Sequence, residues 1–264
     1  MAHTPFEIQA HKGGLKPALF SIFKLFRLHE RRCAACGDIV GQVGAHRVLL
    51  CPRCSQELAP RTTAFCPLCG AMFKAREEPI HPCGDCLGKQ DSRRLKRVVF
   101  HGPHTGRLRQ LVLECKYQGR LGHMHLMQVL LARALERRLN TDLDGWKPDL
   151  LVPIPLHPAR LAMRGFNQSL ELARGPARLL GIPLAGNGLA RTRNNPPQTG
   201  LSALERERNV HRVFSASQDH VSGKTVFLVD DVMTTGSTLE EAARTLRRAG
   251  AARVGGLVLA RTTE

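Results

Sequence analysis

The chain has 264 residues, a formal charge of +17 and a sequence pI near 10.3. This length is sufficient for one sizeable core and a small additional module. The charge attracts polyanions such as nucleic acid, anionic lipid or phosphorylated ligands, without choosing among them. No apolar run has the length of a membrane span and no signal-peptide core is visible, so we expect a cytoplasmic protein with reduced cysteines.

Residues 1–32 are predicted to form an N-terminal tail followed by an amphipathic helix. Apolar residues recur at helical spacing over residues 15–28, with Lys16, Lys24 and Arg27 among them. A basic amphipathic helix can lie on an anionic membrane, or it can pack against the protein's own core. We expect the second arrangement, because it is the commoner one.

Four Cys-x-x-Cys pairs occur within residues 33–87. Two such pairs supply the four thiolates of a tetrahedral zinc site, so the segment predicts two structural zinc ions, which would also fold it. Consecutive pairing gives a double zinc ribbon, and alternate pairing gives a cross-brace. The lower entropy cost of closing short loops favours the ribbon. The predicted ligands are Cys33, Cys36, Cys51, Cys54, Cys66, Cys69, Cys83 and Cys86.

Residues 88–94 are predicted to be a linker, and residues 95–264 a second domain. Strands are expected at residues 98–100, 150–152, 226–229 and 254–259, and helices around residues 108–115, 122–139, 167–180 and 239–249. Gly175 and Pro176 should kink or restart the third of these helices, and Gly181 should end it. Cys115 falls on the apolar side of a helical pattern, so we interpret it as a core residue.

Residues 224–239, KTVFLVDDVMTTGSTL, carry the strongest functional signal. A short apolar strand is followed by two acids, a loop rich in hydroxyl groups and glycine, and a helix. The N-terminus of a helix suits a phosphate, and adjacent carboxylates suit a vicinal diol or Mg²⁺. Together these features describe a site for ribose 5-phosphate; the alternative is an ordinary strand–turn–helix with a capping hydroxyl. The residues concerned are Asp230, Asp231, Thr234, Thr235, Gly236, Ser237 and Thr238.

Three other segments carry cations or amides that would suit a pyrophosphate. One is the turn after residue 113, and another follows the strand at residues 150–152, where open α/β sheets bind ligands. The third is the breaker-rich loop at residues 190–201, which is placed to close over a phosphate site. The alternative is that these are ordinary solvated loops. The candidates are Lys116, Arg160, Arg164, Gly165, Asn167, Arg191 and Arg193.

Four sequence segments together resemble the ComF family, named for its link to natural competence. They are KYQGR at 116–120, VPIPLHPARLAMRGFNQS at 152–169, RTRNNPPQTGLSALERERNV at 191–210 and VDDVMTTGSTL at 229–239. The resemblance implies a Rossmann-like α/β domain of the type I phosphoribosyltransferases behind a zinc-ribbon module. It also implies that the acid pair binds the ribose hydroxyls of phosphoribosyl pyrophosphate (PRPP), with Mg²⁺, and that the TTGST loop binds the 5-phosphate.

The resemblance further implies a cytoplasmic role in handling single-stranded DNA during transformation, in which proteins of the competence machinery are possible partners. Two alternatives stay open at this point. One is a metabolic phosphoribosyltransferase that makes a nucleotide from PRPP and a base, although no segment is an obvious candidate for recognising a purine or pyrimidine base. The other is a zinc-ribbon adaptor that binds nucleic acid without catalysis. Since only 5% of residues are aromatic, we expect contacts to nucleic acid to be mainly with its backbone.

Overall fold

The computed structural model describes most of the chain, and all statements below concern this part of it. The described residues are 32–40, 48–75, 77–88, 94–118, 121–141, 145–192 and 213–263. The helix predicted at residues 15–28, most of the loop at 190–201 and the segment that follows it lie outside them. Within the described residues, no helix combines the length and the apolar character needed to cross a membrane.

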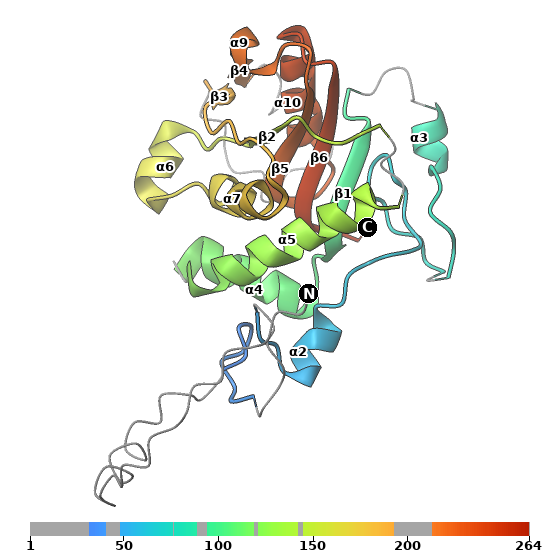
Figure 1. The fold of residues 1–264 in the computed structure, drawn as a ribbon, viewed down its shortest axis with the longest axis vertical. Helices are drawn as coiled ribbons and strands as arrows, with labels where there is room; N and C mark the ends of the chain where they lie inside the picture. The colour runs from blue at the N-terminus through green and yellow to red at the C-terminus, as the bar shows by residue number, and fades with distance from the viewer. Residues whose placement is uncertain are drawn as a thin grey trace, which may run out of the picture.

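A four-stranded parallel sheet forms the centre of the larger part of the molecule (Figure 1). Its strands occur in the order β1 (Arg97–Pro103), β6 (Arg253–Arg261), β5 (Thr225–Met233) and β2 (Leu150–Pro153). They are buried nearly throughout, as expected of a parallel sheet covered on both faces. The four predicted strands are therefore confirmed. A separate antiparallel pair joins β3 (Leu189–Arg191) to β4 (Phe214–Ala216).

Strand β5 is longer than the sequence predicts. The prediction ended it at Val229, before the acid pair, but the strand continues to Met233. Asp230 pairs with Val258, and Met233 pairs with Arg261, so the ladder with β6 holds the acidic segment in extended conformation. The predicted end of the strand was wrong because it was placed where the apolar run stops. The strand ends instead where its backbone pairing with β6 stops.

Helices cover both faces of the sheet. Phe227 and Val229 of β5 lie in one core with α4 (Gly106–Gln118), α5 (Met124–Leu139) and α7 (Gln168–Leu180). Val226 and Leu228, which point to the other face, pack with α10 (Ser237–Arg248). In Figure 1, α5 and α7 accordingly lie in front of the sheet and α10 lies behind it. Short helical segments complete this part: η1 (Leu121–His123), α6 (Pro158–Arg164) and α9 (Gln218–Val221).

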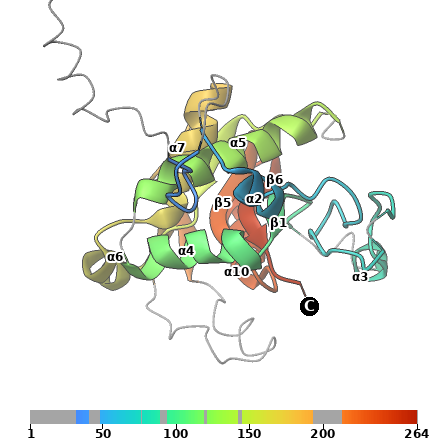
Figure 2. The same ribbon diagram turned by 90° about the horizontal axis from the view of Figure 1, so that it is seen from below.

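The cysteine-rich segment packs against this part of the molecule at two places. The helix α2 (Pro52–Glu57) and the neighbouring chain lie below α4 and α5, where the Leu58 carbonyl is 2.8 Å from Nε2 of the buried His101. The segment that leads to α3 (Gly84–Gly88) lies beside β1 (Figure 2). There the Val98 amide donates to the Pro67 carbonyl over 3.0 Å. The edge of the sheet is thereby covered, which prevents unwanted strand pairing.

Helix α7 runs without interruption through Gly175 and Pro176, so the predicted alternative of a restart there is wrong. Gly175 is needed for packing instead: a Cβ atom there would lie 2.4 Å from Cβ and 2.8 Å from Cα of Gln128 on α5. The absence of a side chain lets the two helices approach closely. Gly181 ends α7 in the left-handed conformation, as predicted.

Substitution Gly175→Ala should lower the free energy of unfolding by about 1–3 kcal/mol, because the added methyl group must displace the α5 backbone. Alanine would otherwise favour a helix over glycine by about 0.5–1 kcal/mol. Urea denaturation checks this, with Gly122→Ala as the control, since nothing lies within 4 Å of a Cβ there. Unchanged or increased stability of Gly175→Ala would contradict the close approach.

Candidate functional site

The acid pair lies at the carboxyl end of β5, and different neighbours hold its two members. Asp230 Oδ1 accepts hydrogen bonds from the Ser169 hydroxyl over 2.8 Å and from the Asp231 amide over 2.9 Å. Asp231 Oδ2 lies 2.7 Å from Nζ of Lys116 at the end of α4, and Asp231 Oδ1 accepts from the Val232 amide over 2.8 Å. Two helices and one strand thus fix both carboxyl groups.

The two groups differ in how their charges are balanced. Burial, followed by the charge of Asp231, raises the pKa of Asp230 to about 7, although Lys116 and the Ser169 hydroxyl act in the opposite direction. Burial by itself lowers the pKa of Lys116, but attraction to Asp231 outweighs it and the net shift is upward. Lys116 therefore stays protonated and balances the charge of Asp231. An additional cation would stabilise the ionised form of Asp230 more than that of Asp231.

The hydroxyl-rich loop follows directly and leads into α10. Gly236 has a φ of 85°, and a Cβ there would lie 2.4 Å from Cε of Met233, so no other residue fits without strain or displacement. The hydroxyl oxygens of Thr235 and Ser237 are 2.7 Å apart. Thr234 and Thr235 are exposed. This loop places hydroxyl groups beside the N-terminus of a helix of 12 residues, which is a favourable environment for a phosphate.

The loop after β2 contributes mainly to the positioning of α7. Asn167 caps this helix by accepting from the Ser169 amide over 3.1 Å, and its side-chain nitrogen donates to the Ile154 carbonyl over 3.1 Å. Arg164 donates to Gln168 over 2.7 Å, and Gly165 ends α6 with a φ of 80°. Asn167 thus holds Ser169, and through it Asp230, in place.

Besides Lys116, the predicted cation Arg191 lies near the acid pair, and Arg160 lies near Arg191. Burial and then the charge of Arg160 lower the pKa of Arg191, and the charge of Asp230 opposes this shift. Arg160, Arg191 and Asp230 therefore interact electrostatically. Arg193 lies outside the described residues. The structure thus brings Lys116 and Arg191 to the acid pair, and Arg160 to Arg191.

Sequence reasoning missed Arg261, the last residue of β6, whose side chain is buried. Its guanidinium donates to the Met233 carbonyl over 3.4 Å, immediately before the hydroxyl-rich loop, and to the Cys69 carbonyl over 3.3 Å. It therefore connects the end of β5 with Cys69 of the cysteine-rich segment. No local pattern marked Arg261, because both of its partners are distant in sequence.

The eight paired cysteines form two groups, and in each group the four sulfur atoms lie within 4.8 Å of one another. Cys33, Cys36, Cys51 and Cys54 make the first, and Cys66, Cys69, Cys83 and Cys86 make the second. This is the consecutive pairing of a double ribbon. A hydrogen bond from Cys69 lowers the pKa of Cys66 to about 4, so one sulfur readily becomes a thiolate. Four thiols in this arrangement are the donor set of a closed, structural zinc site.

The ninth cysteine, Cys115, belongs to neither group. It lies on the buried side of α4, in the core, and burial raises the pKa of its thiol to about 11. A thiol with a raised pKa is a poor nucleophile at neutral pH. The prediction that Cys115 is a core residue is confirmed.

Substitution Cys51→Ser should reduce the zinc content from two ions per chain to about one, because the first group loses a thiolate while the second is intact. Elemental analysis of purified protein measures this. Cys115→Ser is the matched control and should retain both ions. Two ions per chain in Cys51→Ser would show that the ligand assignment is incorrect.

The pH dependence of stability should reveal the unusual pKa of Asp230. Because this pKa is raised from 3.8 to about 7, the folded protein binds more protons than the unfolded chain between these values. The free energy of unfolding should therefore fall as the pH rises, by up to about 2 kcal/mol between pH 5.5 and pH 7.5 relative to Asp230→Asn. Urea denaturation across this range measures the difference. Parallel pH profiles for the two proteins would contradict the raised pKa.

Comparison with known proteins agrees with this arrangement. Residues 118–264 match the family described as the phosphoribosyl transferase domain, and residues 27–87 match the double zinc ribbon domain. The chain is 36% identical over 214 residues to the DNA utilization protein YhgH of Salmonella typhimurium. The matched region covers 81% of this chain and 90% of that protein.

Two proteins named for competence are also similar. Competence protein F of Haemophilus influenzae is 31% identical over 203 residues, covering 76% of this chain and 85% of that protein. Competence protein ComFC of Bacillus subtilis is 28% identical over 241 residues, covering 85% of this chain and 92% of that protein. With a double zinc ribbon followed by an α/β domain of the type I phosphoribosyltransferase class, the chain belongs to the ComF family.

Proposed function

We propose that this protein binds PRPP, or a related phosphoribosyl group, together with Mg²⁺ and assists the cytoplasmic handling of single-stranded DNA during DNA uptake. One observation carries the proposal: β5 delivers two carboxyl groups, each held by a different helix, directly before a hydroxyl-rich loop at the start of α10. The chemistry of these groups is complementary to a ribose bearing a 5-phosphate.

The phosphate would bind the loop formed by Thr234, Thr235, Gly236, Ser237 and Thr238. Hydroxyl groups and the positive end of a helix stabilise an anion there, and Gly236 lets the backbone approach it. The ribose hydroxyls would donate to the carboxylates of Asp230 and Asp231. These two parts of the ligand are adjacent, as the loop and the acids are in the chain.

Mg²⁺ would supply the charge that the acid pair needs. Asp230 and Asp231 would hold this cation, which would favour the ionised form of Asp230 at neutral pH and offset the negative charge of a pyrophosphate. Arg160 and Arg191 interact unfavourably with each other in the structure, so an anion between them would be stabilised. We propose these two, with Lys116, as the pyrophosphate contacts; Arg164, Gly165 and Asn167 would shape the loop around them.

The proposed role in DNA uptake is supported by the relatives, two of which are named for competence and one for DNA utilization. The charge of +17 supports binding of a polyanion, and other proteins of the competence machinery are possible partners. All nine cysteines are unbridged, and eight of them are grouped for metal binding, which suits a reducing compartment.

We also propose the domain bounds 33–87 for the zinc ribbons and 95–264 for the phosphoribosyltransferase-like domain. Residues 1–32 would precede the ribbons, and residues 88–94 would link the two domains. Strand β1 supports the second domain's early start, since Arg97 to Pro103 pair with β6 inside the same sheet.

Calorimetric titration with PRPP, with and without Mg²⁺, tests the proposed ligand. We expect Mg²⁺-dependent binding to the zinc-loaded protein and at least a tenfold weaker affinity in the double variant Asp230→Asn, Asp231→Asn, because both changes remove the negative charge that holds Mg²⁺. Asp219→Asn, at an exposed position on α9, is the control and should bind like the wild type.

No binding to the folded wild type, or equal binding by the double variant, would overturn the proposal. Circular dichroism and zinc content establish that each protein is folded. Incubation of the complex with free bases then shows whether a nucleotide is made, which is the result expected of a metabolic phosphoribosyltransferase.

A further inference from the structure

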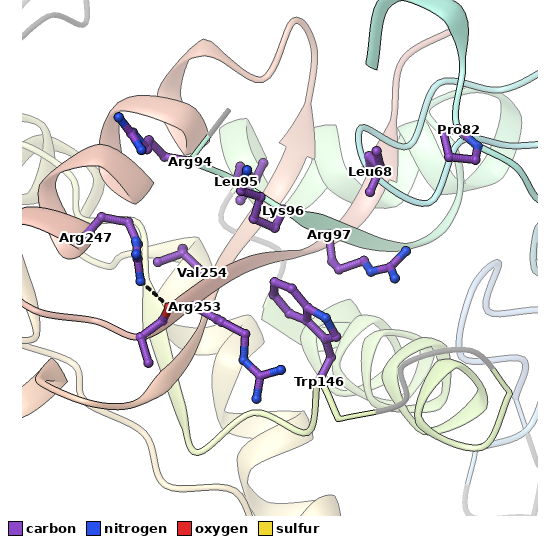
Figure 3. Close-up of a pocket in the computed structure, with 11 residues that line it drawn as sticks. Leu68, Pro82, Arg94, Leu95, Lys96, Arg97, Trp146, Arg247, Arg253 and Val254 are labelled. Atoms are coloured by element: carbon purple, nitrogen blue, oxygen red, sulfur yellow. Dashed lines mark hydrogen bonds between the residues drawn. The ribbon is translucent and has the colours of Figure 1, made fainter. Parts of the chain in front are cut away.

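A cationic cavity of about 570 Å³ lies at the amino ends of β1 and β6, on the edge of the sheet opposite the acid pair (Figure 3). Arg94, Lys96, Arg97, Arg247 and Arg253 line it together with Trp146, and the described residues that line it include no acid. Five cations in one wall attract an anion strongly. The volume is within the range of sites that hold a small organic ligand.

Trp146 provides a flat surface inside this cationic wall. The guanidinium carbon of Arg253 lies 5.1 Å from the centre of the indole, and that of Arg97 lies 5.9 Å from it. The two arginines come from the neighbouring strands β6 and β1, and Figure 3 shows them beside the indole. An aromatic ring with two guanidinium groups can bind a flat ring by stacking and a phosphate by charge.

The other walls hold this arrangement in place. Arg247 donates to the Ala251 and Ala252 carbonyls and so fixes the turn that leads into β6. Leu68, between two cysteines of the second group, and Pro82, beside Cys83, close the opposite side. The cavity is therefore built from both the sheet and the cysteine-rich segment.

We propose that this cavity binds one nucleotide unit of a single-stranded nucleic acid. The backbone phosphate would contact Arg97, Arg253 and Lys96, and the base would stack on Trp146. An unpaired base is required, because a base inside a duplex has no free face for the indole. The inference rests on the proposed role in DNA handling and specifies where the strand is held.

The cavity is separate from the proposed phosphoribosyl site. Asp230 pairs with Val258, five residues along β6 from Arg253, so the acid pair lies about 17 Å along the sheet from Arg253 at about 3.3 Å per residue. A single strand of DNA bound beside Arg253 leaves the acid pair accessible. Binding of PRPP and binding of single-stranded DNA should accordingly be compatible.

Fluorescence offers a direct test, since Trp146 is the sole tryptophan in the sequence. We expect an oligothymidylate of about 15 residues to quench its emission. The affinity, measured by fluorescence anisotropy of a dye-labelled oligothymidylate, should fall about fivefold or more in Arg253→Gln and in Trp146→Leu. Arg253→Gln should also reduce the salt slope by about one. Arg178→Gln, which removes an equal charge on α7 away from the cavity, should change the affinity less than twofold.

Other outcomes separate this inference from the proposed function. Undiminished oligonucleotide binding in a folded Arg253→Gln variant, without quenching in the wild type, would overturn the cavity assignment alone. No oligonucleotide binding by the wild type would overturn both it and the DNA role. Quenching by thymidine monophosphate that the oligonucleotide cannot displace would identify a free-nucleotide site and contradict our proposal. The PRPP titration of Arg253→Gln should match the wild type in every case.

Discussion

The parallel pairing of β5 with β6 is the constraint on which the rest of the structure depends. It extends from Thr225 opposite Arg253 to Met233 opposite Arg261, and it keeps the acidic segment straight. Because neighbouring parallel strands end at the same edge, one edge receives the acid pair and the hydroxyl-rich loop. The opposite edge receives Arg253 and the cationic cavity. Two chemically different sites thus lie at opposite ends of the strands of one sheet.

The cysteine-rich segment is part of this arrangement rather than an appendage. It covers the edge of β1, and through the Cys69 carbonyl it holds Arg261, which also contacts the Met233 carbonyl before the loop. Leu68 and Pro82 of the same segment line the cationic cavity. Zinc bound by the second cysteine group would therefore stabilise the surroundings of both sites, a physical reason for joining the two modules in one chain.

The sequence allowed prediction of features that depend on short patterns. Apolar runs marked the strands, Cys-x-x-Cys spacing marked both metal sites, and the residues from Asp230 to Thr238 marked the candidate ligand site. Features that depend on partners distant in the chain were missed. The length of β5, the close approach at Gly175, and the contacts of Arg261 are all set by tertiary neighbours. The cationic cavity was missed for the same reason, since Arg97, Trp146 and Arg253 are far apart in sequence.

A crystal structure of the zinc-loaded protein with PRPP and Mg²⁺ tests the central claim most directly. We predict the 5-phosphate at residues 234–238, the ribose hydroxyls at Asp230 and Asp231, and Mg²⁺ between the pyrophosphate and the acid pair. A ligand bound at another place, or a phosphate at the loop with the ribose turned away from both acids, would contradict it.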